Sequence, residues 1–324
     1  NVETASVKNP LENSETDFIY PDDKKYNSTT QKLVFSNNNA EEFFSVGNNF
    51  LNEDKFDLAV ENFEKTIEIL NENLAETIAS KGISYSKNGQ IEKGMEEFQK
   101  SLDICPNHAV IRYNLGYSHF VLNQFEKAIP ELEIAFKLRP EKHFQNVLLK
   151  TYYNLGDKYL HSNNFESAIP ILTKAYEIEQ DENNLMNIGI CHLQLNDTKK
   201  AIEILESVTN KNPNDFLTHF NLGTAYSKNG EYDKAIEYDK KALELDPTHH
   251  NINYNMGVTY RELNQLEKSI ESFEKEVNLF PDEAKNHKDL GLMYARAKQF
   301  DKSLESLNKS LKLEPNNSMY YSCL

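Results

Sequence analysis

The stretch YNLGYSHF (residues 113–120) returns in altered form as YNLGDKYL from residue 153, FNLGTAYS from 220 and YNMGVTYR from 254. Each copy joins an aromatic residue to Asn, an apolar residue and Gly. The glycines that anchor these and similar stretches are mostly 33 to 35 residues apart, with one step of 40. A period of this length predicts a tandem array in which each repeat is one supersecondary unit.

Placing the anchoring glycine eighth in each unit divides most of the chain into repeats of similar length. One insertion, residues 143–148, separates the third repeat from the fourth. The predicted repeats are 40–73, 75–108, 109–142, 149–182, 182–215, 216–249, 250–283 and 284–317.

Each repeat has the apolar spacing of two short amphipathic helices. In the third repeat, Leu115 and Gly116 lie on the first helix, and Ala128, Leu132 and Ala135 recur at helical spacing on the second. The turn sequences KNGQ (from 87), SNNF (from 162) and KNGE (from 228) supply Asn and Gly for a left-handed helix exit. Prolines stop the second helices at Pro106, Pro140, Pro213, Pro247, Pro281 and Pro315.

This pattern resembles the tetratricopeptide repeat family over residues 40–317. The sixth repeat carries its characteristic residues at Leu222, Gly223, Tyr226, Ala235, Ala242 and Pro247. The resemblance implies an all-α fold, a right-handed α-α superhelix (solenoid) of eight tandem helix-turn-helix repeats. It also implies that the first helix of each repeat lines the concave face.

The two ends of the chain lack the repeat. Residues 1–39 have no helical period and are rich in Asn, Ser, Thr, Asp and Lys, which predicts a polar, flexible N-terminal tail. Residues 318–324 predict the start of an incomplete capping helix or of a ninth first helix, because an array of this kind needs a polar cap.

Composition excludes several classes of function. The formal net charge of −16 argues against nucleic-acid binding, and no apolar run is long enough for direct membrane insertion. The three cysteines fit no CxxC metal motif or disulfide framework, which favours a reducing compartment and therefore the cytoplasm; a periplasmic or envelope-tethered protein with buried thiols is the alternative. Phosphate-loop, dinucleotide and hydrolase motifs are absent, so we expect no catalytic residue, cofactor or metal.

A polar amide recurs at the sixth place of the repeats, two residues before Gly. A carboxamide both donates and accepts, so a row of them could hold the backbone of an extended peptide. The arrangement is similar to the asparagine ladder of the O-GlcNAc transferase superhelix. The alternative is pairing with a neighbouring helix or with ordered water. The candidate residues are Asn114, Asn154, Asn187, Asn221 and Asn255.

Two further groups of side chains accompany the asparagines. Aromatic residues would form side-chain pockets for the peptide, or else pack between repeats; they are Tyr113, Tyr117, Tyr153, Phe220 and Tyr254. Basic residues gather in the last repeats and would bind acidic residues of the peptide, or else lie on a solvated face; they are Arg261, Lys285, Lys288 and Arg296.

One candidate peptide lies in the chain itself. LENSETDFIYPDD (residues 11–23) combines carboxylates with Phe18, Ile19 and Tyr20 and resembles a short linear motif, which leads to the hypothesis that the tail occupies the groove in cis or from a neighbouring molecule. A flexible tether is the alternative. Within the sixth repeat, His219 and Asp239 replace apolar residues, which predicts a hydrogen-bonded pair.

Together these features predict a non-catalytic protein–protein interaction scaffold that binds an extended, acidic peptide segment in its concave groove. Two other interpretations stay open. The chain could be the substrate-recognition region of a larger enzyme such as a glycosyltransferase, or an assembly or tethering protein of a cell envelope.

Overall fold

The computed structural model describes residues 18–19, 38–53 and 55–315, and all regular structure within them is α-helical. None of these helices has the length and hydrophobicity needed to cross a membrane. The helices are α1 (Asn38–Asn52), α2 (Phe56–Lys87), α3 (Ile91–Ile104), α4 (Ala109–Val121), α5 (Phe125–Leu138), α6 (Lys142–His161), α7 (Phe165–Ile178), α8 (Glu182–Gln194), α9 (Thr198–Lys211), α10 (Phe216–Lys228), α11 (Tyr232–Leu245), α12 (Ile252–Glu262), α13 (Leu266–Leu279), α14 (Ala284–Arg296) and α15 (Phe300–Leu313).

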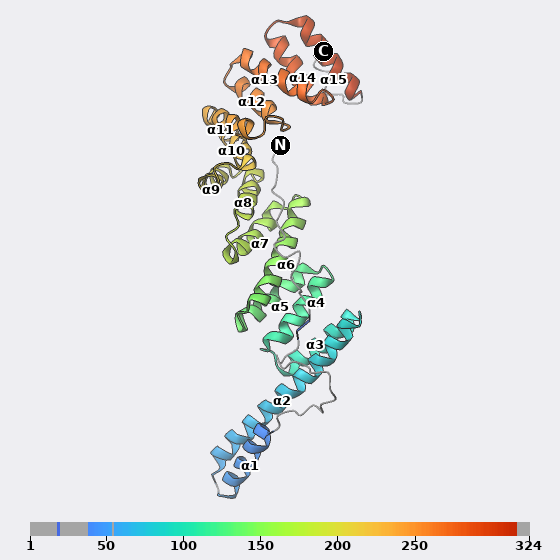
Figure 1. Cartoon of the computed structure of the whole chain (residues 1–324), viewed down its shortest axis with the longest axis vertical. Helices are drawn as coiled ribbons and strands as arrows, with labels where there is room; N and C mark the ends of the chain where they lie inside the picture. The colour runs from blue at the N-terminus through green and yellow to red at the C-terminus, as the bar shows by residue number, and fades with distance from the viewer. Residues whose placement is uncertain (1–17, 20–37, 54, 316–324) are drawn as a thin grey trace. The chain divides into compact units, whose positions relative to one another are not determined.

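Contacts divide the chain into two compact units, one comprising residues 9–155 and the other mainly residues 156–324. Within each unit, consecutive helices pack as antiparallel pairs, for example α4 with α5 and α10 with α11 (Figure 1). Each second helix also contacts the first helix of the following repeat, as α3 does with α4 and α13 with α14. This confirms the predicted all-α array of stacked helix pairs.

The turns inside the repeats follow one geometry. The fifteenth place adopts a left-handed backbone in each of the repeats from the second to the eighth, with φ between 55° and 82°. Asparagine and glycine tolerate this region best, which explains their recurrence in the turn sequences. The residues concerned are Gly89, Asn123, Asn163, Asn196, Gly230, Asn264 and Lys298.

Close approach of the paired helices explains the anchoring glycine. A Cβ atom added to Gly116 would lie 2.7 Å from Leu132 Cγ, and one added to Gly291 would lie 2.8 Å from Leu307 Cγ. Because such distances are too short for carbon atoms, only glycine fits at the eighth place. Small residues at the twentieth place complete the contact, and the Ser303 hydroxyl donates to the Gly291 carbonyl at 2.8 Å.

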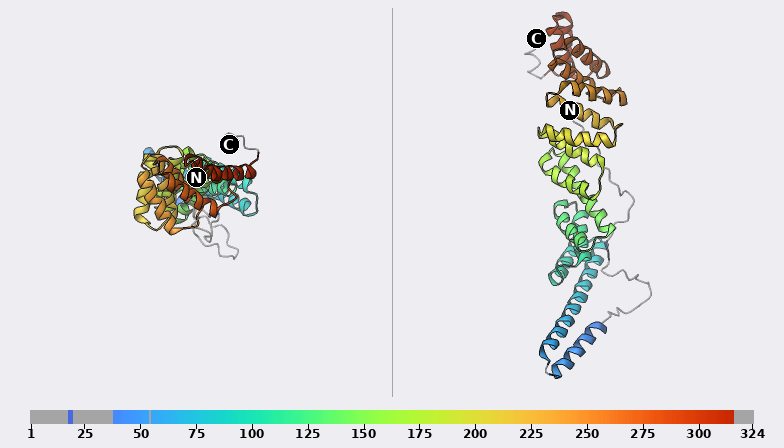
Figure 2. Two further views of the ribbon diagram at one scale, coloured as in Figure 1. Left: turned by 90° about the horizontal axis from the view of Figure 1, so that it is seen from above. Right: turned by 90° about the vertical axis from the view of Figure 1, so that its left-hand side faces the viewer.

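Helix α2 departs from the expected pattern because it runs unbroken for 32 residues, through the predicted boundary between the first and second repeats. Its first half pairs with α1 as a hairpin and its second half pairs with α3 (Figures 1 and 2). Residues 71–74, NENL, lack the proline that follows most other second helices, which permits continuation, although α7 ends without a proline as well. Residues 318–324 and most of the predicted tail lie outside the described residues.

Candidate functional site

The described part of the N-terminal tail contacts α4 through the side chain of Asn114. The backbone N–H of Ile19 donates to Asn114 Oδ1 at 2.9 Å, and Asn114 Nδ2 donates to the Ile19 carbonyl at 2.6 Å. One carboxamide thus satisfies both backbone groups of one residue, 95 positions away in the sequence. This contact depends on the backbone of residue 19 and not on its side chain.

Burial makes this pairing important for the fold as well. Asn114 is fully buried in the middle of α4, where a buried amide without partners would cost about 1–3 kcal/mol. Asparagine is also a poorer helix former than alanine or leucine. Its presence at this place is therefore explained by the hydrogen bonds to Ile19.

An aromatic pocket receives the preceding residue, Phe18, which is only 9% exposed. Its ring centroid lies 5.0 Å from that of Tyr117, edge to face at 79°, and 6.2 Å from that of Phe98. The sequence predicted Tyr117 as a pocket residue but missed Phe98. Phe98 occupies the twenty-fourth place of its repeat, where the pattern indicates a core residue, so only its aromatic character could have marked it.

The other candidate asparagines have different surroundings. Asn187 and Asn221 are fully buried, and Asn154 is half-buried. Asn255 Nδ2 donates to Thr224 Oγ1 at 3.2 Å, which links α12 to α10. Asn255 therefore makes the neighbouring-helix contact that stood as the alternative to peptide binding.

The aromatic candidates other than Tyr117 and Tyr254 lie inside the packing. Tyr113 is fully buried and stacks on Phe144, with the ring centroids 4.7 Å apart and the planes inclined by 12°. Tyr153 and Phe220 are also buried. These three rings have the surroundings expected for packing between repeats.

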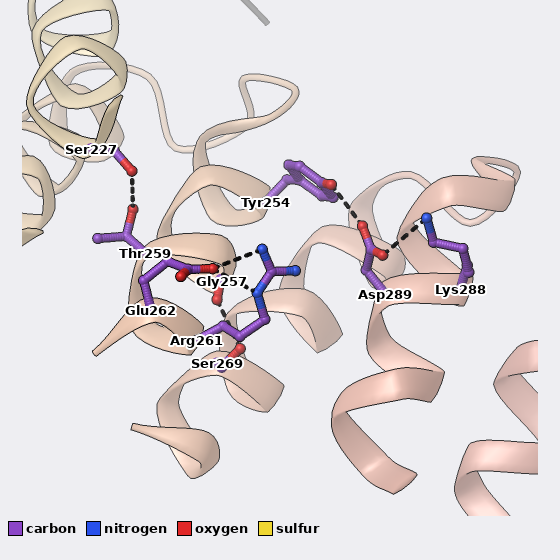
Figure 3. A network of polar contacts seen from close by, with 9 residues as sticks. All are labelled: Ser227, Tyr254, Gly257, Thr259, Arg261, Glu262, Ser269, Lys288 and Asp289. Atoms are coloured by element: carbon purple, nitrogen blue, oxygen red, sulfur yellow. Dashed lines mark hydrogen bonds and ion pairs between the residues drawn. The ribbon is translucent and has the colours of Figure 1, made fainter. Parts of the chain in front are cut away.

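Three of the four basic candidates of the last repeats contact acidic or aromatic groups, and Figure 3 shows two of them, Arg261 and Lys288. Asp289 accepts from the Tyr254 hydroxyl at 2.6 Å and forms an ion pair with Lys288 at 3.2 Å. The Lys285 ammonium lies 4.0 Å from the centre of the Tyr254 ring, and burial lowers the pKa of this lysine. Arg261 pairs with Glu262 at 3.0 Å, whereas Arg296 is exposed.

Family models identify the repeats. Models described as tetratricopeptide repeat match residues 75–108, 159–219, 216–249, 240–271 and 284–317. Together these matches cover more than half of the chain, and three coincide with repeats predicted from the glycine spacing. The chain belongs to the tetratricopeptide repeat family. Proteins of this family bind protein partners, so the chain is a protein-interaction scaffold.

The solved structures that match part of this chain include several described as MamA. A MamA RS-1 ArsTM double mutant is 27% identical, covering 53% of this chain and 97% of its own, with a TM-score of 0.49. MamA 41-end from Desulfovibrio magneticus RS-1 is also 27% identical, covering 52% and 97%, with a TM-score of 0.49. A further crystal structure of MamA is 23% identical, covering 51% and 97%, with a TM-score of 0.47. No curated protein matches the chain.

The predicted pair of His219 and Asp239 is wrong. His219 Nε2 donates to the Pro213 carbonyl at 2.8 Å, and His287 makes the same contact with Pro281 at 2.8 Å. Both histidines hold the fourth place of a tetratricopeptide repeat. In each repeat the imidazole therefore provides the carbonyl of the proline six residues earlier with a hydrogen-bond donor. Both carboxyl oxygens of Asp239 are buried without a hydrogen-bond partner among the described residues, and burial raises the pKa of Asp239 well above its usual range.

Proposed function

We propose that this protein is a non-catalytic scaffold that holds an extended protein segment against its first helices mainly through backbone hydrogen bonds. Asn114 is the anchor, and Phe98 and Tyr117 form the pocket for an aromatic side chain. The observation that carries the proposal is the two-way hydrogen bond between Asn114 and Ile19. It supports the proposal because the Asn114 side chain binds both the backbone N–H and the backbone carbonyl of the same tail residue.

In this proposal the tail segment around Phe18 and Ile19 is a ligand in cis. The remaining residues of the predicted segment 11–23 lie outside the described residues. A partner segment with an aromatic residue followed by an apolar one would bind the same place in competition with the tail. The chain would therefore select partners by one side chain and by extended conformation.

The energies indicate that such competition is feasible. Two hydrogen bonds contribute about 1–3 kcal/mol together, and burial of a phenylalanine contributes about 2 kcal/mol. Fixing each backbone residue costs about 1–2 kcal/mol. The net binding free energy that remains is small. It is sufficient for the tail in cis, because tethering gives an effective concentration in the millimolar range. A partner with a few additional contacts can displace it.

The test uses the full chain and a fluorescent peptide with the sequence of residues 11–23. The double variant Phe18→Ala/Ile19→Gly empties the aromatic pocket and makes the tail backbone more flexible, so we expect the peptide to bind at least about tenfold more tightly than to wild type. Adding Asn114→Ala should remove most of that binding.

The matched control is Asn255→Ala in the same double-variant background. This asparagine donates to Thr224 and not to the tail, so the peptide affinity should stay unchanged. Equal peptide binding with and without Asn114 would contradict the proposal, as would equal binding by wild type and the double variant.

A further inference from the structure

A cluster of metal-ligating side chains lies apart from Asn114, where α2 faces the junction between α3 and α4. Glu72 and Glu76 are four residues apart on α2, so both project from the same face of the helix. One ligand atom each from Glu72, Glu76 and His108 lie within 4.8 Å of one another. His108 Nε2 is 3.6 Å from Glu76 Oε1, beyond hydrogen-bond distance.

The local charge at this cluster is not balanced by protein groups. Among the described residues, no lysine or arginine forms an ion pair with Glu68, Glu72 or Glu76, which follow one another at intervals of four residues. His108 faces Glu76 through Nε2. A cation bound by this nitrogen and by the two carboxylates would compensate their negative charge.

His108 is the N-cap residue of α4 and lies in the short connection that follows α3. The three candidate ligands therefore come from two separate segments of the chain, α2 and the connection between α3 and α4.

We propose that Glu72, Glu76 and His108 form a site for a divalent transition-metal ion of the zinc type. Imidazole and carboxylate are ligands of Zn²⁺, and three protein ligands leave the fourth tetrahedral position to water. Ligand bonds of about 2.1 Å place nitrogen and oxygen donors about 3.4 Å apart in a tetrahedron. The distance of 3.6 Å between His108 Nε2 and Glu76 Oε1 is close to that separation.

The site would add a link between α2 and the connection from α3 to α4. Glu72 and Glu76 lie where α2 passes through the predicted boundary of the first repeat, and His108 lies between α3 and α4. Metal binding is coupled to folding when the ligands come from different elements. The ion would therefore raise the melting temperature of this part of the chain.

The test titrates the purified, reduced full chain with Zn²⁺ against a chromophoric chelator. We expect binding of one ion, and at least about tenfold weaker binding in His108→Ala and in Glu72→Gln/Glu76→Gln, because even loss of outer-shell partners costs 10- to 100-fold. The matched control is His161→Ala, which removes a surface histidine 3.2 Å from Asp157 that has no comparable set of ligands. Circular dichroism checks that each variant is folded.

Co²⁺ tests the ligand set through its visible spectrum. The cobalt complex of wild type should show d–d absorption that is lost in His108→Ala and kept in His161→Ala. Unchanged Zn²⁺ affinity in both His108→Ala and the double glutamine variant would overturn the site. A thiolate-to-metal charge-transfer band in the cobalt complex would overturn the ligand assignment, because it would show a cysteine bound to the ion.

Discussion

Replacing Asp239 by leucine should stabilise the protein. Asp239 is fully buried, and its two oxygens have no hydrogen-bond partner among the described residues. The twenty-fourth place of several other repeats holds a leucine packed against the anchoring glycine, as Leu132 does against Gly116 and Leu205 against Gly189. Leucine at position 239 would meet the same kind of surroundings at Gly223.

The expected gain has two parts. An unsatisfied buried carboxyl costs about 1–3 kcal/mol, and burial of a leucine side chain contributes about 1.5–3 kcal/mol. Allowing for imperfect packing of the larger side chain, we expect Asp239→Leu to raise the free energy of unfolding by about 3 kcal/mol near neutral pH.

The pH dependence identifies the cause. Burial raises the pKa of Asp239 in the folded chain well above its unfolded value of about 3.9. The unfolded chain therefore releases this proton first as the pH rises. The contribution of Asp239 ionisation to the free energy of unfolding is therefore greatest below the unfolded pKa. It falls by about 1.4 kcal/mol per pH unit until the pH reaches the raised pKa of the folded chain. Asp239→Leu removes this contribution, so its advantage over wild type should grow with pH in that window.

Hydrogen exchange of the α10 and α11 amides, measured at several pH values, is the appropriate assay because repeat arrays can unfold locally. The control Leu205→Asp places a carboxyl at the same place of the preceding repeat and should destabilise α8 and α9, with a similar pH dependence. Comparing wild type with Asp239→Leu also cancels the effect of Glu276, whose pKa is likewise raised by burial. Unchanged or faster exchange in Asp239→Leu at every pH would refute the reasoning.

Three other predictions follow from local geometry. Lys298 has a positive φ of 58°, so Lys298→Gly should stabilise the last repeat by about 1 kcal/mol in denaturant unfolding; a loss of stability would contradict the strain argument. Burial raises the pKa of Cys191 to about 12, so iodoacetamide should leave this thiol unmodified in the folded chain and label it after denaturation, as peptide mass spectrometry can check. Asn255→Ala should destabilise the α10–α12 contact by about 1 kcal/mol because it removes the donor to Thr224; hydrogen exchange in α12 that matches wild type would show that the contact contributes nothing.

The sequence predicted the features that depend on local spacing. Glycines and small residues that recur every 33 to 35 positions determine where helices can approach, and Asn or Gly at the turns supplies the left-handed backbone. The continuity of α2 was also visible in principle, since its NENL stretch lacks a proline, but absence of a helix breaker is a weaker indication than its presence.

For contacts between segments far apart in the sequence, the type of contact could be predicted but not the pairs of residues that make it. Asn114 was expected to hold a peptide backbone, and Phe18 and Ile19 were expected to act as a ligand, but no period in the tail fixes which residue meets which helix. The His219 and Asp239 prediction failed because it assumed that two polar exceptions must pair. His219 instead bonds to a proline carbonyl six residues away, a partner that a side-chain pattern does not display.

The most direct measurement of the central claim is the hydrogen-exchange rate of the Ile19 amide in the full chain, observed by NMR. The account predicts that this amide exchanges at least about tenfold more slowly than in a free peptide, corresponding to about 1.4 kcal/mol, because it donates to Asn114 Oδ1. The protection should disappear in Asn114→Ala and persist in Asn255→Ala. An Ile19 amide that exchanges at the free-peptide rate in wild type, or stays protected without Asn114, would contradict it.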